Sequence, residues 1–331
     1  MPLALKNGEV LRGRYKILER IGQGGMGNIY LADDTRLEGR KCALKEVEYE
    51  RALPNQVLDQ AREQFLREAT VLARLDHPNL PKVSDFFSNS LRDYLVMDFV
   101  PGKDLRELMM EARRKKIFLS EPEVLGWAVQ LADALNFLHL QEPPIVHRDI
   151  KPSNLKITPS SVLKLVDFGL VKIMAPDEVT ITIIQGQGTA LYTPLEQYGS
   201  DDTHTDVRAD IFSTGATLYH VLTNEPPSDA RRRFLDSSSL ILPREINSDI
   251  TARTEKAILW AMALHPDDRP DTIQEFREAL IGDREVPLHQ TSQRTAGASA
   301  SQVPAARSIE SILGYTAAGL FLLGLITTLI R

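Results

Sequence analysis

The hydrophobic pattern of this chain changes its period about a third of the way along. Early segments at 15–18, 28–31 and 42–45 alternate as β-strands do. Later segments repeat apolar residues at steps of three and four, which is one face of a helix, over 124–138. The segment 210–222 repeats this pattern more apolarly and indicates a buried helix. A strand-rich first third followed by a helix-rich remainder predicts an α+β chain with two lobes.

The residues near the C-terminus have a different composition. Residues 312–330 carry no charge, and as a helix they would be about 28 Å long, close to the ~30 Å hydrocarbon thickness of a bilayer. A buried amphipathic helix is the alternative, but no polar face recurs at helical spacing. Residues 283–308 are rich in Ser, Ala, Thr and Gln and predict a flexible tether. We expect a juxtamembrane linker over 282–308 and a transmembrane helix over 309–331.

Charge and cysteine content narrow the functional classes. The net charge is −6 with acids and bases interspersed, which does not favour nucleic-acid binding. The single cysteine, Cys42, excludes an internal disulfide. Residues 1–11 lack the apolar core of a secretory signal, so we expect none. Arg294 and Arg307 precede the predicted span and favour a single-pass membrane protein with its folded part in the cytoplasm.

A glycine motif lies between two strand-like runs. Gly22, Gly24 and Gly27 form Gly-x-Gly-x-x-Gly, and glycine lets a backbone approach phosphate oxygens closely. A dinucleotide-binding turn would need a helix next, whereas residues 29–32 are strand-like. A plain glycine hairpin remains an alternative. Lys45 follows on the next strand and either neutralises phosphate or is a solvated surface lysine. Glu68, in a helical run that opens at Phe65, is the carboxylate that could pair with Lys45.

The segment 145–154 carries the strongest chemical signal. Asp149 could accept a proton from an acceptor hydroxyl, and Asn154 could offer a neutral oxygen to a metal. Asp167 follows a strand in Asp-Phe-Gly and offers a second oxygen donor, although this tripeptide alone could be a turn. Mg²⁺ prefers such oxygen ligands together with phosphates. Phosphoryl transfer depends mainly on positioning and charge neutralisation, so the motifs together predict it.

In this combination and order the motifs resemble those of the eukaryotic-like protein kinases, in particular the membrane-bound bacterial serine/threonine kinases. The resemblance covers about 11–281. It implies a two-lobed kinase fold, with a small antiparallel-sheet N-lobe and one main helix over 11–98, and a larger helical C-lobe over 99–281. It also implies ATP and Mg²⁺ as cofactors, with Mn²⁺ as an alternative, and proteins with Ser or Thr acceptors as substrates.

The resemblance assigns roles to individual residues. Asp149 would orient the acceptor hydroxyl, Lys151 would reach the γ-phosphate, and Lys45 would contact phosphates while paired with Glu68. Metal ions would be held by Asn154 and Asp167. The residues implied in ATP binding are Ile21, Gly22, Gly24, Gly27, Ile29, Ala43, Lys45, Met97 (the gatekeeper position), Asp98 and Val100.

The resemblance also implies structural roles and shows departures. Glu196 would pair with Arg269, and Asp210 would anchor the loop that holds Asp149. Residues 188–197 resemble a substrate-docking loop, although the usual Ala-Pro-Glu reads Pro-Leu-Glu at 194–196. Lys156 replaces the aliphatic residue that normally lies beneath adenine, and its methylene stem could still cover the base.

Regulation is expected in the segment between Asp167 and Glu196. We predict autophosphorylation of Thr180 or Thr182, with the phosphate paired to Arg148, and a homodimer would allow this in trans. Thr189 is expected to hydrogen-bond near Asp149, and plain loop residues are the alternative for all of these threonines. A pseudokinase scaffold and a small-molecule phosphotransferase of the aminoglycoside kinase type are the competing functions. The intact catalytic residues argue against the first, and the docking loop argues against the second.

Overall fold

The computed structural model describes residues 4–24, 27–49, 54–89, 92–167, 172–173, 190–198, 206–282 and 284–287. Met1–Val286 form one compact unit, and Pro287–Arg331 form a second. The predicted transmembrane helix and nearly all of the predicted linker lie outside the described residues. Within the described ranges, no helix is both long enough and apolar enough to span a bilayer.

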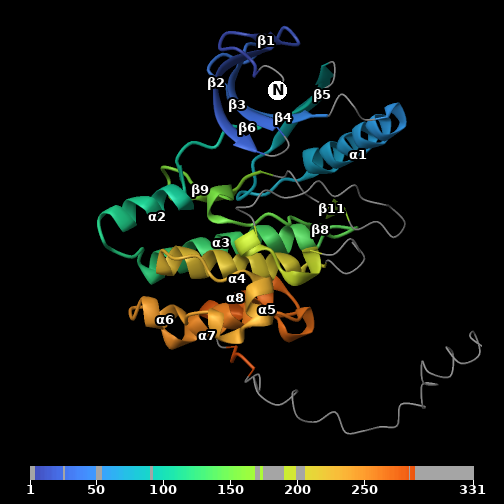
Figure 1. Cartoon of the computed structure of the whole chain (residues 1–331). Helices are drawn as coiled ribbons and strands as arrows, with labels where there is room; N and C mark the ends of the chain where they lie inside the picture. Colours follow the sequence, from blue (N-terminus) through green and yellow to red (C-terminus); the bar gives the residue numbers. More distant parts are fainter. Residues whose placement is uncertain are drawn as a thin grey trace, which may run out of the picture. The chain divides into compact units, whose positions relative to one another are not determined.

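The N-terminal region of the compact unit is an antiparallel sheet of six strands in the order β1-β2-β3-β4-β6-β5 (Figure 1). Its strands are β1 (Val10–Leu11), β2 (Tyr15–Gly24), β3 (Gly27–Asp34), β4 (Lys41–Glu48), β5 (Val83–Asn89) and β6 (Arg92–Asp98). The strands predicted at 15–18, 28–31 and 42–45 are confirmed as parts of β2, β3 and β4.

Helix α1 (Asn55–Arg74) packs beside this sheet, against β5 and β6. The sequence placed its start at Phe65, which is wrong, because the helix begins at Asn55. The first half of α1 is mostly polar, so its apolar residues are too few to show a helical period.

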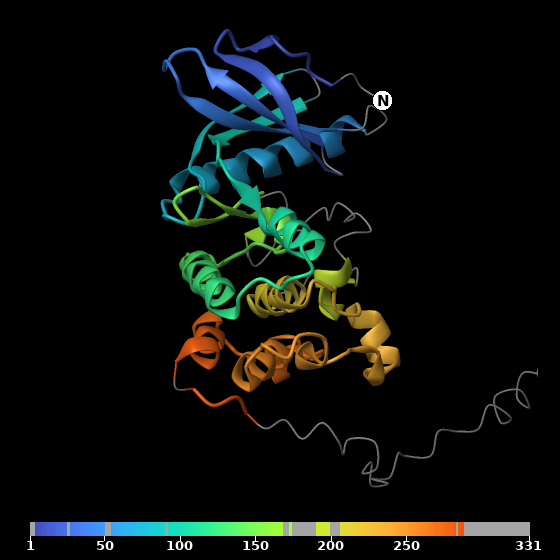
Figure 2. The same cartoon turned by 90° about the vertical axis from the view of Figure 1, so that its left-hand side faces the viewer.

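The remainder of the unit is mainly helical, and Figures 1 and 2 show it at the opposite end from the sheet. Its helices are α2 (Leu105–Arg114), α3 (Glu121–His139), α4 (Arg208–Thr223), α5 (Ala230–Leu235), α6 (Pro243–Ile246), α7 (Ala252–Ala261) and α8 (Ile273–Ile281). The predicted helices at 124–138 and 210–222 are confirmed as α3 and α4. The two-lobed α+β fold is therefore confirmed.

Short elements connect these helices. The strands β7 (Lys103–Asp104), β9 (Leu155–Ile157) and β10 (Leu163–Leu165) form one small sheet, and β8 (Ile145–Val146) pairs with β11 (Lys172–Ile173). The 3-10 turns are η1 (Pro152–Asn154), η2 (Ala190–Tyr192), η3 (Leu195–Tyr198), η5 (Ser237–Ser239) and η6 (Pro266–Asp268). Helix α2 begins with a capping box, in which Asp104 and Glu107 each accept a hydrogen bond from the other residue's backbone N–H.

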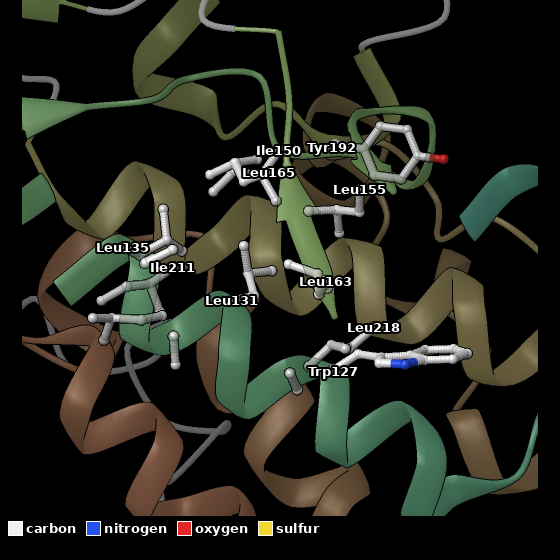
Figure 3. Close-up of a cluster of buried hydrophobic side chains, with 14 of the residues drawn as sticks. Trp127, Leu131, Leu135, Ile150, Leu155, Leu163, Leu165, Tyr192, Ile211 and Leu218 are labelled. Atoms are coloured by element: carbon white, nitrogen blue, oxygen red, sulfur yellow. The ribbon is translucent and has the colours of Figure 1, made fainter. Parts of the chain in front are cut away.

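One large apolar core joins the helical region to the inner face of the sheet. In Figure 3 Leu131 and Leu135 of α3 lie near Ile211 of α4 and Leu163 of β10. The side chains of Ile150 and Leu155, from the loop and strand around η1, belong to the same core. Burial of these side chains fixes that loop against α3 and α4. Trp127 and Trp260 are buried in this core as well.

Candidate active site

Asp210 of α4 holds the loop that precedes η1. Its buried carboxylate accepts hydrogen bonds from the backbone N–H groups of His147 and Arg148, both at 2.8 Å, and lies 3.0 Å from Nε2 of His139. Burial raises the pKa of Asp210, but the contact with His139 and these donors outweigh it and hold the pKa below its usual value. Arg148 adopts a left-handed φ of 66° at this turn. The predicted anchoring of the loop by Asp210 is confirmed.

Asp149, Lys151 and Asn154 form a compact polar cluster next to this turn. Lys151 Nζ donates to both Asp149 carboxylate oxygens, at 2.9 and 2.8 Å. Asn154 Nδ2 donates to the Asp149 carboxylate at 2.9 Å and to its backbone carbonyl at 2.8 Å. Because the amide nitrogen of Asn154 points at Asp149, its Oδ1 is the atom that remains for a cation; Ser153 Oγ donates to this oxygen at 3.4 Å.

Lys45 of β4 reaches across to the carboxylate of Asp167, and the two form an ion pair. Asp167 follows β10 with a φ of 70°, and Val166 N–H donates to the Asn154 carbonyl at 2.8 Å. Burial raises the pKa of Asp167, but the Lys45 ammonium outweighs it and keeps the pKa below its ordinary value. The sheet thus brings a cation to the place where the helical region brings the oxygen donors of Asn154 and Asp167.

The predicted pairing of Lys45 with Glu68 is not formed in this structure. The Glu68 carboxylate accepts a hydrogen bond from Gln64 Nε2 at 3.0 Å, one turn earlier on α1. Burial raises the pKa of Glu68, against the lowering by Gln64 and by the more distant charge of Lys45. Asp167 therefore takes the ammonium that the sequence assigned to Glu68. One lysine with two acidic neighbours can contact either, and residue types alone do not decide between them.

The glycines of the motif lie at the adjoining ends of β2 and β3, with Gly24 opposite Gly27 and Gly22 opposite Ile29 in the ladder. A strand rather than a helix follows it, as the sequence predicted. Gly27 has a φ of 148°, and a side chain there would overlap the backbone carbonyl oxygen of Glu46. This position therefore requires glycine.

Three of the residues predicted to bind ATP, Ile29, Ala43 and Met97, share one face of the sheet with Lys45. Ile29 pairs with Lys45, and Ala43 pairs with Met97, in adjacent ladders. Since side chains alternate along a strand, Ala43 and Lys45 project from the same face of β4. Around this set, Ile21 is 43% exposed, Val100 is buried, and Asp98 N–H donates to the Lys82 carbonyl at 2.9 Å. Lys156 of β9 places its ammonium 5.9 Å from the ring centre of Phe99.

Glu196 and Arg269 form the predicted buried ion pair. Arg269 Nη1 and Nη2 donate to the two Glu196 oxygens at 2.6 and 3.0 Å. The guanidinium also donates to the carbonyls of Ala263, Arg208 and Leu264, which satisfies it fully within the fold. This pair joins η3 to the segment before α8, and its prediction is confirmed.

Two contacts of histidines were missed by the sequence. His139 supports Asp210, and His220 Nδ1 lies 2.7 Å from the Tyr192 hydroxyl. Neither contact is evident from spacing, because both histidines lie far along the chain from their partners. The sequence offered one indication, which is that both histidines lie in largely apolar helical segments, where a polar side chain needs a partner. Thr180, Thr182 and Thr189 lie outside the described residues.

The cluster has the donor set of a phosphate–metal site rather than of an all-protein metal cage. In the part of the chain that the structure describes, no group of three or more His, Cys, Asp or Glu side chains could hold a metal. One carboxylate and one amide oxygen suit Mg²⁺, which usually keeps waters and phosphate oxygens among its ligands. Lys45, Lys151 and Asp149 add two cations and a carboxylate around the same position.

Comparisons with known proteins agree with this geometry. The protein kinase domain family matches residues 15–280. Serine/threonine-protein kinase PknB of Mycolicibacterium smegmatis is 33% identical over 292 residues, covering 82% of this chain and 43% of that protein. Tyrosine-protein kinase MasK of Myxococcus xanthus is 31% identical over 280 residues, covering 81% and 42%. The solved apo form of PpkA-294 gives a TM-score of 0.66 at 27% identity, covering 84% of this chain and 99% of that one. The chain spans about two fifths of the length of the curated relatives it matches.

Proposed function

Because the chain belongs to the protein kinase domain family, we propose that it transfers the γ-phosphoryl group of ATP to serine or threonine hydroxyls of proteins. The observation that carries the proposal is the convergence of Lys45 from the sheet with Asp167, Asn154 and Asp149 from the helical region. Phosphoryl transfer needs such positioned charges more than it needs covalent chemistry.

Each group has a role that its contacts support. The Asp149 carboxylate, held by Lys151 and Asn154, accepts the hydrogen bond of the acceptor hydroxyl and takes its proton. Lys151 lies beside it and neutralises charge on the transferred group, and Lys45 does so for the phosphates nearer the adenosine. Asn154 Oδ1 and the Asp167 carboxylate are the atoms that would hold Mg²⁺, which neutralises phosphate charge when bound.

The nucleotide lies, in this proposal, along the face of the sheet that carries Lys45. The turn of Gly22, Gly24 and Gly27 covers the phosphates, and Ile29, Ala43 and Met97 contact the adenine. Ile21 covers the same side, and the backbone of Asp98 and Val100 bonds the adenine edge. Glu68, which lies on α1 beside the sheet, would be the partner of Lys45 when Asp167 holds a metal ion.

The acceptor amino acid is tested by phosphoamino-acid analysis. The chain is incubated with γ-labelled ATP, Mg²⁺ and a mixed protein substrate, and the labelled products are hydrolysed. Label on phosphoserine or phosphothreonine is expected, since Lys151 follows Asp149 as in serine/threonine kinases. Label confined to phosphotyrosine would overturn the specificity, and the name of the relative MasK makes that outcome worth measuring. No label at all would favour a pseudokinase scaffold.

We also propose that residues 309–331 anchor the enzyme in a membrane with the kinase domain in the cytoplasm. The uncharged stretch 312–330 supports this. The full chain should stay with membranes after alkaline carbonate washing, and a chain ending at 308 should be released. Recovery of the full chain in the wash would contradict the anchor.

Autophosphorylation of Thr180 or Thr182, in trans within a homodimer, is proposed as the activating step. Arg148, at the turn before Asp149, is the cation that would pair with the phosphate. Phosphopeptide mapping of the ATP-treated chain checks this, and both sites unmodified would contradict it.

A further inference from the structure

The segment 190–198, here termed the docking segment, is held by the same helix that holds the catalytic loop. Ser213 of α4 donates to the Tyr192 carbonyl at 2.8 Å, and Thr217 donates to the Ile150 carbonyl at 3.3 Å. Tyr198 closes the segment on itself by donating to the Ala190 carbonyl at 2.9 Å. A polypeptide that presents its hydroxyl to Asp149 therefore meets a docking segment fixed in place by α4.

The docking segment carries little charge of its own towards such a polypeptide. Tyr192 stacks on His220, with ring centres 6.0 Å apart, and its hydroxyl lies 2.7 Å from Nδ1. Burial raises the pKa of Tyr192 to about 12 and lowers the pKa of His220 to about 4. Both side chains are neutral at neutral pH. Glu196, the acidic residue of the segment, is already paired with Arg269.

Arginines of α2 lie on one side of the docking segment. Arg106 is exposed on α2, which packs against η1 and α4, and its charge acts against the rise in the pKa of Tyr192. Arg113 is exposed, contributes to the lowered pKa of His220, and pairs with Glu225 at 3.1 Å. Among the described residues, no carboxylate lies within ion-pair distance of Arg106, so its charge faces solvent.

Arginines of α5 lie on the other side. The Arg231 guanidinium carbon stands 4.3 Å from the ring centre of Tyr198, and Arg232 is exposed next to it. Neither forms an ion pair with a carboxylate in the described ranges. Asp229 accepts the Arg232 N–H at 3.1 Å as the cap of α5. On the same short helix Phe234 and Leu235 are 70% and 85% exposed, which adds apolar surface beside the arginines.

We propose that the arginines flanking the docking segment, Arg106, Arg113, Arg231 and Arg232, select protein substrates with acidic residues around the acceptor. This inference rests on the proposed phosphotransfer and names the substrate class of that site. Exposed opposite charges steer encounters and reject like-charged partners. The exposed Phe234 and Leu235 would contact an apolar residue of the same substrate.

Three peptides with one acceptor threonine test this inference on the full chain. They differ only in flanking residues, which are glutamate, glutamine or lysine. We expect kcat/KM for the glutamate peptide to exceed that for the glutamine peptide by about threefold to tenfold, and the lysine peptide to be poorest. The preference should weaken between low salt and ~0.5 M salt, because exposed charges are screened.

Charge reversal then identifies the surface. In Arg231→Glu and in Arg106→Glu the ratio of glutamate to lysine peptide should fall, with an absolute gain for the lysine peptide that a misfolded variant cannot give. Arg36→Gln, an exposed arginine in the turn between β3 and β4, is the matched control and should keep the wild-type ratio.

The outcomes separate the two proposals. Equal kcat/KM for the three peptides, with all of them phosphorylated, overturns the acidic preference and leaves phosphotransfer standing. So does loss of binding to anionic vesicles in Arg231→Glu with an unchanged peptide ratio, which would indicate a membrane surface. Failure to phosphorylate any peptide overturns the proposed function itself.

Discussion

The ammonium of Lys45 contacts the carboxylate of Asp167, although one residue belongs to the sheet and the other follows a strand of the helical region. Glu68, the other acidic candidate, is hydrogen-bonded to Gln64 instead. In the proposed function Lys45 neutralises phosphate charge and Asp167 holds a metal ion. Because the two side chains are in contact, Asp167 would share its carboxylate between Lys45 and a bound metal ion.

Removal of the Asp167 carboxylate should therefore reduce the dependence of nucleotide binding on Mg²⁺. In the wild-type chain, Mg²⁺ should strengthen binding of a fluorescent ATP analogue relative to EDTA by about tenfold or more. In Asp167→Asn most of this gain should disappear, since an amide is a weaker ligand for a hard cation. Asp133→Asn, on the exposed side of α3, is the control. An identical Mg²⁺ effect in both variants would exclude Asp167 as a metal ligand.

The buried pair of Glu196 and Arg269 should be the most costly ion pair to break. Glu196→Gln leaves an uncompensated guanidinium with no exposed surface, so the free energy of unfolding should fall by about 3–5 kcal/mol. Lys103→Gln removes an exposed pair with Glu111 and should cost less than about 1 kcal/mol. Urea unfolding followed by fluorescence measures both. Equal losses in the free energy of unfolding would show that burial of Arg269 does not increase the cost of breaking its ion pair.

Replacement of two helical glycines by alanine should change the stability of the fold in opposite directions. A Cβ at Gly215 of α4 would lie 2.8 Å from the Cβ of Ala261, so Gly215→Ala should destabilise the fold by about 1–3 kcal/mol. Gly126 of α3 has no atom within 4 Å of such a Cβ, and Gly126→Ala should stabilise it by up to about 1 kcal/mol. Thermal unfolding shows whether each substitution lowers or raises the stability. A stabilised Gly215→Ala would contradict the close packing of α4 on α7.

Acidification should destabilise the fold through buried histidines. Burial lowers the pKa of His220 to about 4 and also lowers that of His147. Unfolded histidine titrates near pH 6.5. Between pH 6.5 and 4 the unfolded chain therefore binds more protons, and the free energy of unfolding falls as pH falls. His220 contributes up to about 1.4 kcal/mol per pH unit, less whatever solvent screening removes.

The slope of the free energy of unfolding against pH tests whether His220 causes this destabilisation. His220→Gln should flatten the slope over that window, whatever its effect on stability at pH 7. His265→Gln, which replaces a histidine with 67% of its side chain exposed, is the control. If the pH dependence of stability is unchanged in His220→Gln, protonation of His220 does not destabilise its contact with Tyr192.

Local motifs explain why much of the site was predictable. Asp149, Lys151 and Asn154 lie within one short loop, so their mutual contacts follow from the loop's conformation. The anchoring by Asp210 and the pair of Glu196 with Arg269 were predicted from the family resemblance, and the geometry confirms both.

Where two side chains compete for one partner, the residue types do not predict which contact forms. Lys45 has Glu68 and Asp167 as acidic neighbours, and which it contacts depends on differences of position that no spacing encodes. His220 and Tyr192 come from different segments, and their contact required the packing of the docking segment on α4. The polar first half of α1 likewise gave no period from which to place its start.

The central claim is tested most directly by transfer of label from γ-labelled ATP to a protein acceptor. Four full-length chains are compared: wild type, Asp149→Asn, Lys45→Met and Lys41→Met, the last an exposed lysine of the same strand. We predict that Asp149→Asn lowers the rate by about 10²–10⁴-fold while ATP still binds. Lys45→Met should lose most of the activity, and Lys41→Met should match wild type. Equal labelling in all four chains would contradict the assignment of these groups to phosphotransfer.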